Sequence, residues 1–116
     1  MSTVAQARVL VFRPGVAPEV TTVETSLEAM RELVGGNLGG IKIADSIFLH
    51  FDDEGRLLGK PTCAFVEGLG DVAVGVCFAM GVDADGAPRS LDDAELDLVR
   101  KIVTPAAFVA RERFQA

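Results

Sequence analysis

The sequence predicts an α+β fold, a mostly antiparallel sheet packed on one face by two to three helices, in a single domain spanning residues 1–116. Three observations lead to this prediction. A chain of 116 residues is large enough for one hydrophobic core. Most of it consists of short apolar segments bounded by glycine, proline or acidic turns, which is typical of strands. Two segments instead repeat their apolar residues at helical spacing, and the expected order is β-β-α-β-β-β-β-α-α.

The N-terminal part predicts two strands and one helix. The apolar run within residues 7–15 indicates a strand, and residues 18–25 alternate in polarity as a short partner strand. Thr25 is followed three residues later by Glu28, which is the pattern of a capping box. We therefore expect a helix from about Ser26 to Val34. Its apolar residues share one face: Leu27, Met30, Leu33 and Val34.

The stretch ELVGGNLGG, Glu32–Gly40, raises the question of a phosphate-binding loop. Such loops place their glycines before a helix, so that the N-terminal N–H groups of the helix face the anion. Here the glycines follow a helix, and their spacing fits neither nucleotide-binding fingerprint. Gly35 stands where a left-handed residue commonly closes a helix. We interpret the stretch as a helix stop, with a ligand loop as the alternative.

Several strands are expected in the middle of the chain. Residues 41–43 alternate in polarity, and residues 47–51 form a further apolar segment after a short turn. The turn DDEG is expected to close a hairpin onto residues 56–58, with Gly55 supplying a positive φ. Residues 71–83 form a nearly unbroken apolar run, which predicts a central strand buried on both faces.

The C-terminal part predicts two helices. Ser90 with Asp93 forms a second capping-box pattern. The helix behind it carries apolar residues on one face: Leu96, Val99, Ile102 and Val103. Thr104 as N-cap and Pro105 as the first helical position then predict a C-terminal helical tail over residues 105–116.

Composition and charge exclude several classes of function. The net charge is −6 and no run of Lys or Arg exists, so we expect no binding to nucleic acid. No segment reaches the roughly 18 apolar residues of a spanning helix, and the N-terminus lacks a signal-peptide pattern. We therefore expect a cytoplasmic protein with no membrane association. Cys63 and Cys77 are expected to be reduced thiols in the core, with a disulfide as the alternative.

The segment LHFDDEG contains the single histidine, His50, beside Asp52, Asp53 and Glu54. Histidine with carboxylates can bind a metal ion or exchange protons. Strand alternation places His50 and Asp52 on one face, and we expect the acidic turn to be a solvated hairpin tip. The sequence indicates no catalytic set, no metal site and no cofactor. The candidates for contact with a ligand are the cations that could meet a phosphate and one neighbouring acid: Arg13, Lys42, His50, Arg89 and Asp52.

Four stretches, VLVFRPG, TSLEAMRELVGGNL, HFDDEGRLLGKP and VAVGVCFAMGVDADGAPRSLDD, together resemble the domain-of-unknown-function family 3846, small proteins common in phage, plasmid and bacterial genomes. The resemblance covers about Val9 to Asp93. It implies the fold and a mobile-element context, but no established activity. Asp52 stands where relatives often have Asn, and Thr62-Cys63 stand where an Asn often follows the proline. If those asparagines bind a ligand in relatives, this chain lacks them at both positions.

Three functions remain open from the sequence. The first is a small non-enzymatic binding or regulatory protein, a phage or mobile-element accessory that engages another protein. The second is a small-ligand or nucleotide-binding module. The third is an enzyme, which would need His50, Asp52 and Glu54 to converge in a cleft.

Self-association is also expected. A small sheet leaves two edges, and residues 41–43 and 20–23 are short, apolar candidates for them. The tail carries further large apolar residues, which must complete the core or meet another subunit: Phe108, Val109 and Phe114. A homodimer is the expected assembly and a monomer is the alternative.

Overall fold

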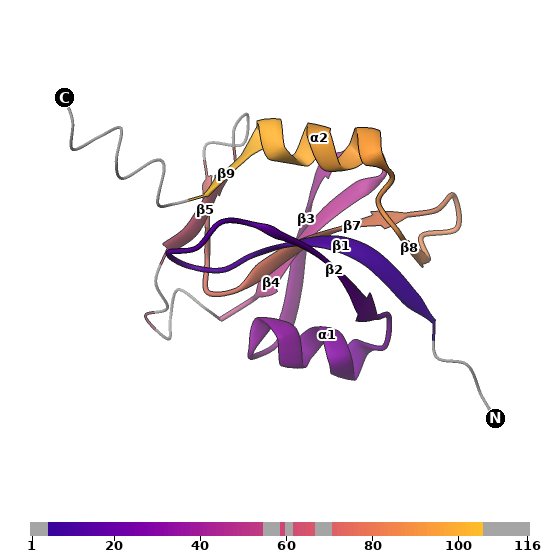
Figure 1. Ribbon diagram of the computed structural model, residues 1–116. Coiled ribbons are helices and arrows are strands. Elements are labelled where there is room, and N and C mark those ends of the chain that lie inside the picture. The colour runs from indigo at the N-terminus through magenta and orange to yellow at the C-terminus, as the bar shows by residue number, and fades with distance from the viewer. Residues whose placement is uncertain (1–4, 55–58, 60–61, 67–70, 106–116) are drawn as a thin grey trace.

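The computed structural model describes residues 5–54, 59, 62–66 and 71–105 of the chain (Figure 1). The elements follow in this order: β1 (Gln6–Phe12), β2 (Glu19–Glu24), α1 (Leu27–Val34), β3 (Leu38–Ala44), β4 (Ile47–Asp52), β5 (Thr62–Val66), β6 (Asp71–Val74), β7 (Cys77–Val82), β8 (Pro88–Arg89), α2 (Asp93–Ile102) and β9 (Val103–Pro105). No helix in these ranges is long and apolar enough to cross a membrane.

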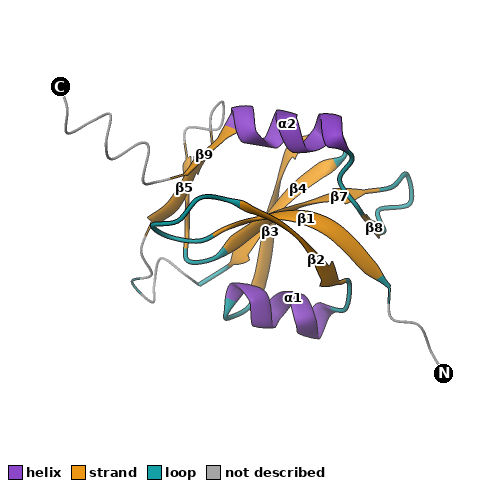
Figure 2. Ribbon diagram, in the orientation of Figure 1, coloured by secondary structure: helices purple, strands orange, loops and turns teal. Residues whose placement is uncertain are grey.

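The described strands form two antiparallel sheets (Figure 2). The larger has six strands in the order β2-β1-β7-β4-β3, with β8 also paired to β7. The smaller has the order β6-β5-β9. The α+β class with a mostly antiparallel sheet is therefore confirmed. The strand β7 is central and almost wholly buried, as its continuous apolar sequence predicts.

The two helices lie on opposite faces of the large sheet (Figure 1), so the expectation that the helices pack on one face of the sheet is wrong. Strand β1 shows the reason. Leu10 and Phe12 point into a buried cluster with α2, whereas Val9 and Val11 point into a second cluster with α1. A strand that is apolar at consecutive positions needs cover on both of its faces.

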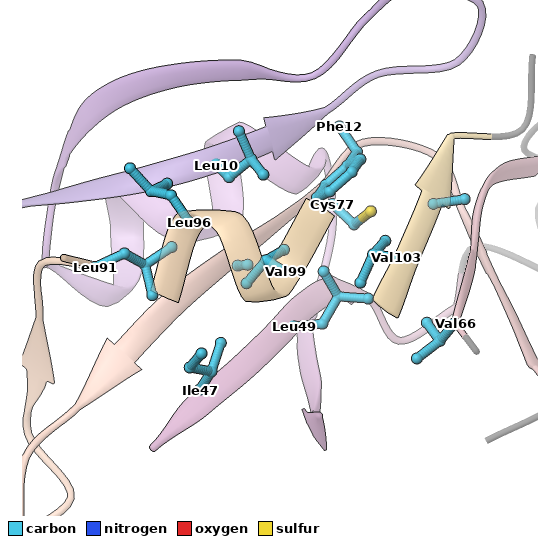
Figure 3. Close-up of a cluster of buried hydrophobic side chains, with 12 residues drawn as sticks. Leu10, Phe12, Ile47, Leu49, Val66, Cys77, Leu91, Leu96, Val99 and Val103 are labelled. Atoms are coloured by element: carbon cyan, nitrogen blue, oxygen red, sulfur yellow. The ribbon is translucent and has the colours of Figure 1, made fainter. Parts of the chain in front are cut away.

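The cluster on the α2 face is the larger of the two (Figure 3). Leu96 and Val99 of α2 pack there against Leu10, Phe12 and neighbouring residues of the central strands. The small sheet completes it, since Ala64, Val66 and Val103 belong to the same cluster. The α1 face is covered mainly by one helix, through Met30 and Val34.

Both helix caps differ by a residue or two from the sequence prediction. Helix α1 is capped by Ser26, whose side chain accepts a hydrogen bond from Ala29 N, because the Thr25 hydroxyl donates to the carbonyl of Ala5. Helix α2 is capped by a capping box of Asp92 and Glu95. The predicted cap, Ser90, instead accepts a hydrogen bond from the backbone of Arg8 on β1.

Two predicted elements are wrong. The single strand expected over residues 71–83 is two strands, β6 and β7, which belong to different sheets. Gly75, with φ of +70°, separates them, and an apolar run gives no sign of such a break. Thr104 and Pro105 do not start a helix but lie in β9, where Thr104 pairs with Phe65.

Other sequence predictions concern residues outside the described ranges. Residues 106–116 and the hairpin expected over residues 56–58 lie outside the described residues. The same holds for the side chain of Cys63, whereas Cys77 is buried in the core. That both cysteines are reduced thiols, with a disulfide as the alternative, therefore stays a prediction.

Candidate functional site

A strip of polar side chains runs along strands β3 and β4 on the face that carries α1. Side chains alternate between the two faces along β4. Leu49 points into the α2-side cluster, so His50 and Asp52 point to the α1 side. Lys42 of β3 lies opposite Phe48 and therefore shares this face. The structure thus places three of the five candidate residues on one face of the large sheet.

The glycines of ELVGGNLGG make room for this strip. A Cβ atom at Gly36 would lie 2.5 Å from the carboxylate of Asp52, and one at Gly40 would lie 3.0 Å from Nδ1 of His50. Gly35 does end α1 as predicted, with φ of +73° and its N–H donating to Arg31 O at 2.8 Å. The interpretation as a helix stop is therefore correct for Gly35 and incomplete for the others.

Asp52 is the one charged residue of the described chain that is buried, with 2% of its surface exposed. Its Oδ1 accepts a hydrogen bond from the backbone N–H of Glu54 at 3.0 Å. The same turn is joined to the segment after α1, since Asp53 N donates to Asn37 O and Asn37 Nδ2 donates to Glu54 Oε1. Asp53 and Glu54 are exposed, so the expectation of a solvated hairpin tip is correct for them and wrong for Asp52.

His50 lies half-buried between two aromatic rings. Its ring centroid is 6.2 Å from that of Phe48 and 5.1 Å from that of Phe78. Its Nε2 atom is buried and has no hydrogen-bond partner in the described part of the chain. Burial lowers the pKa of His50 below the ordinary 6.5, and a hydrogen bond to the backbone of Gly39 opposes this only in part. The imidazole is therefore neutral at neutral pH.

Arg89 lies on β8, away from this strip, and its charge is neutralised. Its two terminal nitrogens donate to the two carboxylate oxygens of Glu95, each at 2.7 Å, and its Nε donates to Val82 O at 3.1 Å. These hydrogen bonds lower the pKa of Glu95. Arg89 therefore joins β8 to α2 and is not available to a phosphate group.

Arg13 follows the end of β1 and lies 4.0 Å from a carboxylate oxygen of Glu19. The side chains of Arg13 and Glu19 are 42% and 65% exposed, so water screens this ion pair and it adds little stability. Lys42 is exposed on the strand β3. Of the cations proposed from the sequence, only Lys42 and His50 are brought together by strand pairing.

The strip contains no obvious metal site. Within the described ranges, no three His, Cys, Asp or Glu residues lie close enough together to hold a metal ion. What the strip offers chemically is one exposed ammonium, one neutral imidazole and one buried carboxylate, arranged in line along two paired strands.

One comparison with known proteins gives a match. The family described as "Domain of unknown function (DUF3846)" matches residues 7–104. This range runs from the second residue of β1 through all of α2, and it confirms the resemblance found in the sequence. Neither a curated protein nor a solved structure matches the chain.

Proposed function

The chain belongs to the DUF3846 family, and we propose that it is a small, non-enzymatic protein-binding module that engages another protein chain through an open edge of its large sheet. A cytoplasmic location and an accessory role in a phage or another mobile element, which the resemblance implies, form part of the same proposal.

The observation that carries this proposal is the outer edge of β3. Among the described residues, β3 pairs with β4 on one side and with no strand on the other. Asp53 N donates to Asn37 O, which marks these two residues as a hydrogen-bonded pair of the β3–β4 ladder. Hydrogen-bonded and non-bonded pairs alternate, so the N–H and C=O groups of Leu38, Gly40 and Lys42 point away from β4.

Such an edge binds an extended segment of another chain by adding a strand to the sheet. Backbone groups supply the hydrogen bonds, and the side chains on the two faces supply selectivity. Gly40 and Lys42 are both exposed. The strand is apolar except for Lys42, so this edge does not share the negative charge of the chain. The opposite edge, β2, carries Glu19 and Glu24.

The test compares two edge substitutions. Lys42→Pro removes an outward N–H from β3, and Thr22→Pro is the matched change on β2, where Thr22 also points its backbone outward. Proteins captured by the parent chain and by Thr22→Pro, but not by a folded Lys42→Pro variant, are purified and mixed with the parent chain. Slower amide hydrogen exchange at Gly40 and Lys42 in the complex supports the proposal. Binding that leaves those two amides unchanged, or that only Thr22→Pro abolishes, contradicts it.

A small-ligand module is the second candidate, because the Nε2 atom of His50 is buried and without a hydrogen-bond partner in the described chain. A buried polar nitrogen of this kind calls for an explanation, and a ligand is one. Lys42, on the same face, would supply the charge for an anion. Nuclear magnetic resonance of the His50 imidazole during titration with inorganic phosphate and with nucleotides tests this. Unchanged imidazole signals throughout the titration would exclude these ligands.

A further inference from the structure

We propose that the partner of the β3 edge is a second copy of this chain, which pairs antiparallel with β3 about a two-fold axis at Ile41. The inference rests on the proposed function, since it names the protein that the edge engages. It joins the two large sheets into one continuous sheet across the dimer.

The direction of the backbone groups limits the registers of such a pair. Outward-pointing residues of one copy must lie opposite outward-pointing residues of the other, because hydrogen-bonded pairs exchange both bonds. Within Gly40–Lys42 this leaves three symmetric arrangements, centred on Gly40, Ile41 or Lys42.

Side chains select among these three. Centring on Lys42 places two ammonium groups directly opposite each other, which is unfavourable. Centring on Gly40 places two glycines opposite each other, with no side-chain contact. Centring on Ile41 places the two Ile41 side chains opposite each other and places each Lys42 opposite the partner's Gly40.

The Ile41-centred register fits the surroundings of each residue. Ile41 packs against the α2-side cluster, so two Ile41 side chains in contact connect the cores of the two copies. Lys42 lies opposite a residue without a side chain, so its long stem meets no steric obstacle. Beside that glycine lies the imidazole of His50, which is neutral at neutral pH and does not repel the ammonium group.

Charge also distinguishes β3 from the other edge. The chain carries a net charge of −6, and contact between copies is opposed wherever acidic residues meet. Pairing of β2 with itself brings the Glu19 and Glu24 residues of both copies onto one two-stranded ribbon. Strand β3 contributes no acidic residue to the contact, and its single charge is positive.

Cysteine cross-linking of the full chain tests the register. In a non-hydrogen-bonded antiparallel pair the Cα atoms lie about 4.5 Å apart, within the range that a disulfide can bridge. The Ile41→Cys variant should therefore form a covalent dimer under mild oxidation, and peptide mass spectrometry should locate the link between the two Cys side chains at position 41. Thr22→Cys, at an outward-pointing position of β2, is the control on the other edge of the sheet. The parent chain controls for Cys63 and Cys77.

Light scattering of the parent chain completes the experiment. We expect the mass of two chains at micromolar concentration, reduced to one chain in a folded Lys42→Pro variant. A parent chain with the mass of one copy, or a covalent dimer from Thr22→Cys alone, overturns the inference. If the parent chain is monomeric but a different protein slows amide exchange at Gly40 and Lys42, the proposed function stands and only the second copy is wrong. If the parent chain is monomeric and no other protein slows amide exchange at Gly40 and Lys42, both the proposed function and the proposed dimer are wrong.

Discussion

The contact between Gly36 and Asp52 gives the sharpest prediction about how this chain is built. We expect Gly36→Ala to destabilise the protein, because the new methyl group would lie 2.5 Å from the carboxylate of Asp52. The carboxylate cannot easily move away. It is buried, and its Oδ1 accepts the hydrogen bond from Glu54 N.

Two opposing contributions decide whether Gly36→Ala raises or lowers the free energy of unfolding. Gly36 does not have a positive φ, and at such positions Gly→Ala ordinarily stabilises a protein by about 0.4–1 kcal/mol through the unfolded state. Overpacking of a filled site costs about 1–3 kcal/mol. The expected net change is therefore a loss of about 1–2 kcal/mol. For a domain of this size that lowers the melting temperature by about 4–8 °C.

Urea denaturation followed by circular dichroism measures the change, in the parent chain and in an Asp52→Ala background. In that background the methyl group has room, so Gly36→Ala should become neutral or stabilising. Gly86→Ala is the control for backbone strain alone, since Gly86 has φ of +83° and no atom lies within 4 Å of the position that a Cβ atom would take there. A Gly36→Ala variant as stable as the parent, or an equal loss in both backgrounds, refutes the reasoning.

Three further predictions concern single residues. Gly35→Ala should lower the free energy of unfolding by about 1 kcal/mol, because a left-handed cap strains any side chain; an unchanged urea midpoint contradicts this. Burial lowers the pKa of His50 in the folded state, so the unfolded chain binds more protons and stability should fall as pH drops below 6.5, levelling off below the folded pKa. His50→Gln should remove that slope from a plot of unfolding free energy against pH, and persistence of the slope would assign it elsewhere. Arg89 lowers the pKa of Glu95, so this pair stabilises the fold above pH 4.5 and the contribution is lost as pH falls through the folded pKa. At neutral pH Glu95→Gln should lower the free energy of unfolding by about 1 kcal/mol. Arg89→Ala should then destabilise the Glu95→Gln variant less than it destabilises the parent chain. Strictly additive losses in this double-mutant cycle would contradict the pairing.

Local patterns account for the elements that the sequence predicted well. Helix α1 was expected from about Ser26 to Val34 and is found at Leu27–Val34. The helical spacing of its apolar residues identifies the helix, and Gly35 marks its end. The centrality of β7 follows in the same way from its unbroken apolar residues. Such features depend only on neighbours in sequence.

The missed features depend on tertiary contacts, which the periodicity of the sequence does not show. The cover on both faces follows from α1 and α2 packing on opposite sides of β1, which no local pattern shows. The burial of Asp52 depends on Gly36, which strand pairing brings beside it. Arg89 was a candidate ligand residue because its sequence neighbours do not reveal that Glu95, in the first turn of α2, binds its guanidinium group.

The position of β7 has a consequence for how the chain folds during synthesis. The hairpins β1–β2 and β3–β4 do not pair with each other in the large sheet, since β7 lies between β1 and β4. Contacts between segments so distant in sequence make folding slow, because the loop entropy is lost before the contacts form. A nascent chain that ends before Cys77 has both hairpins and α1 but no strand to join them. Until Val82 has left the ribosome the two hairpins cannot join into one sheet, and the face of β1 that carries Leu10 and Phe12 stays uncovered until α2 has also been made.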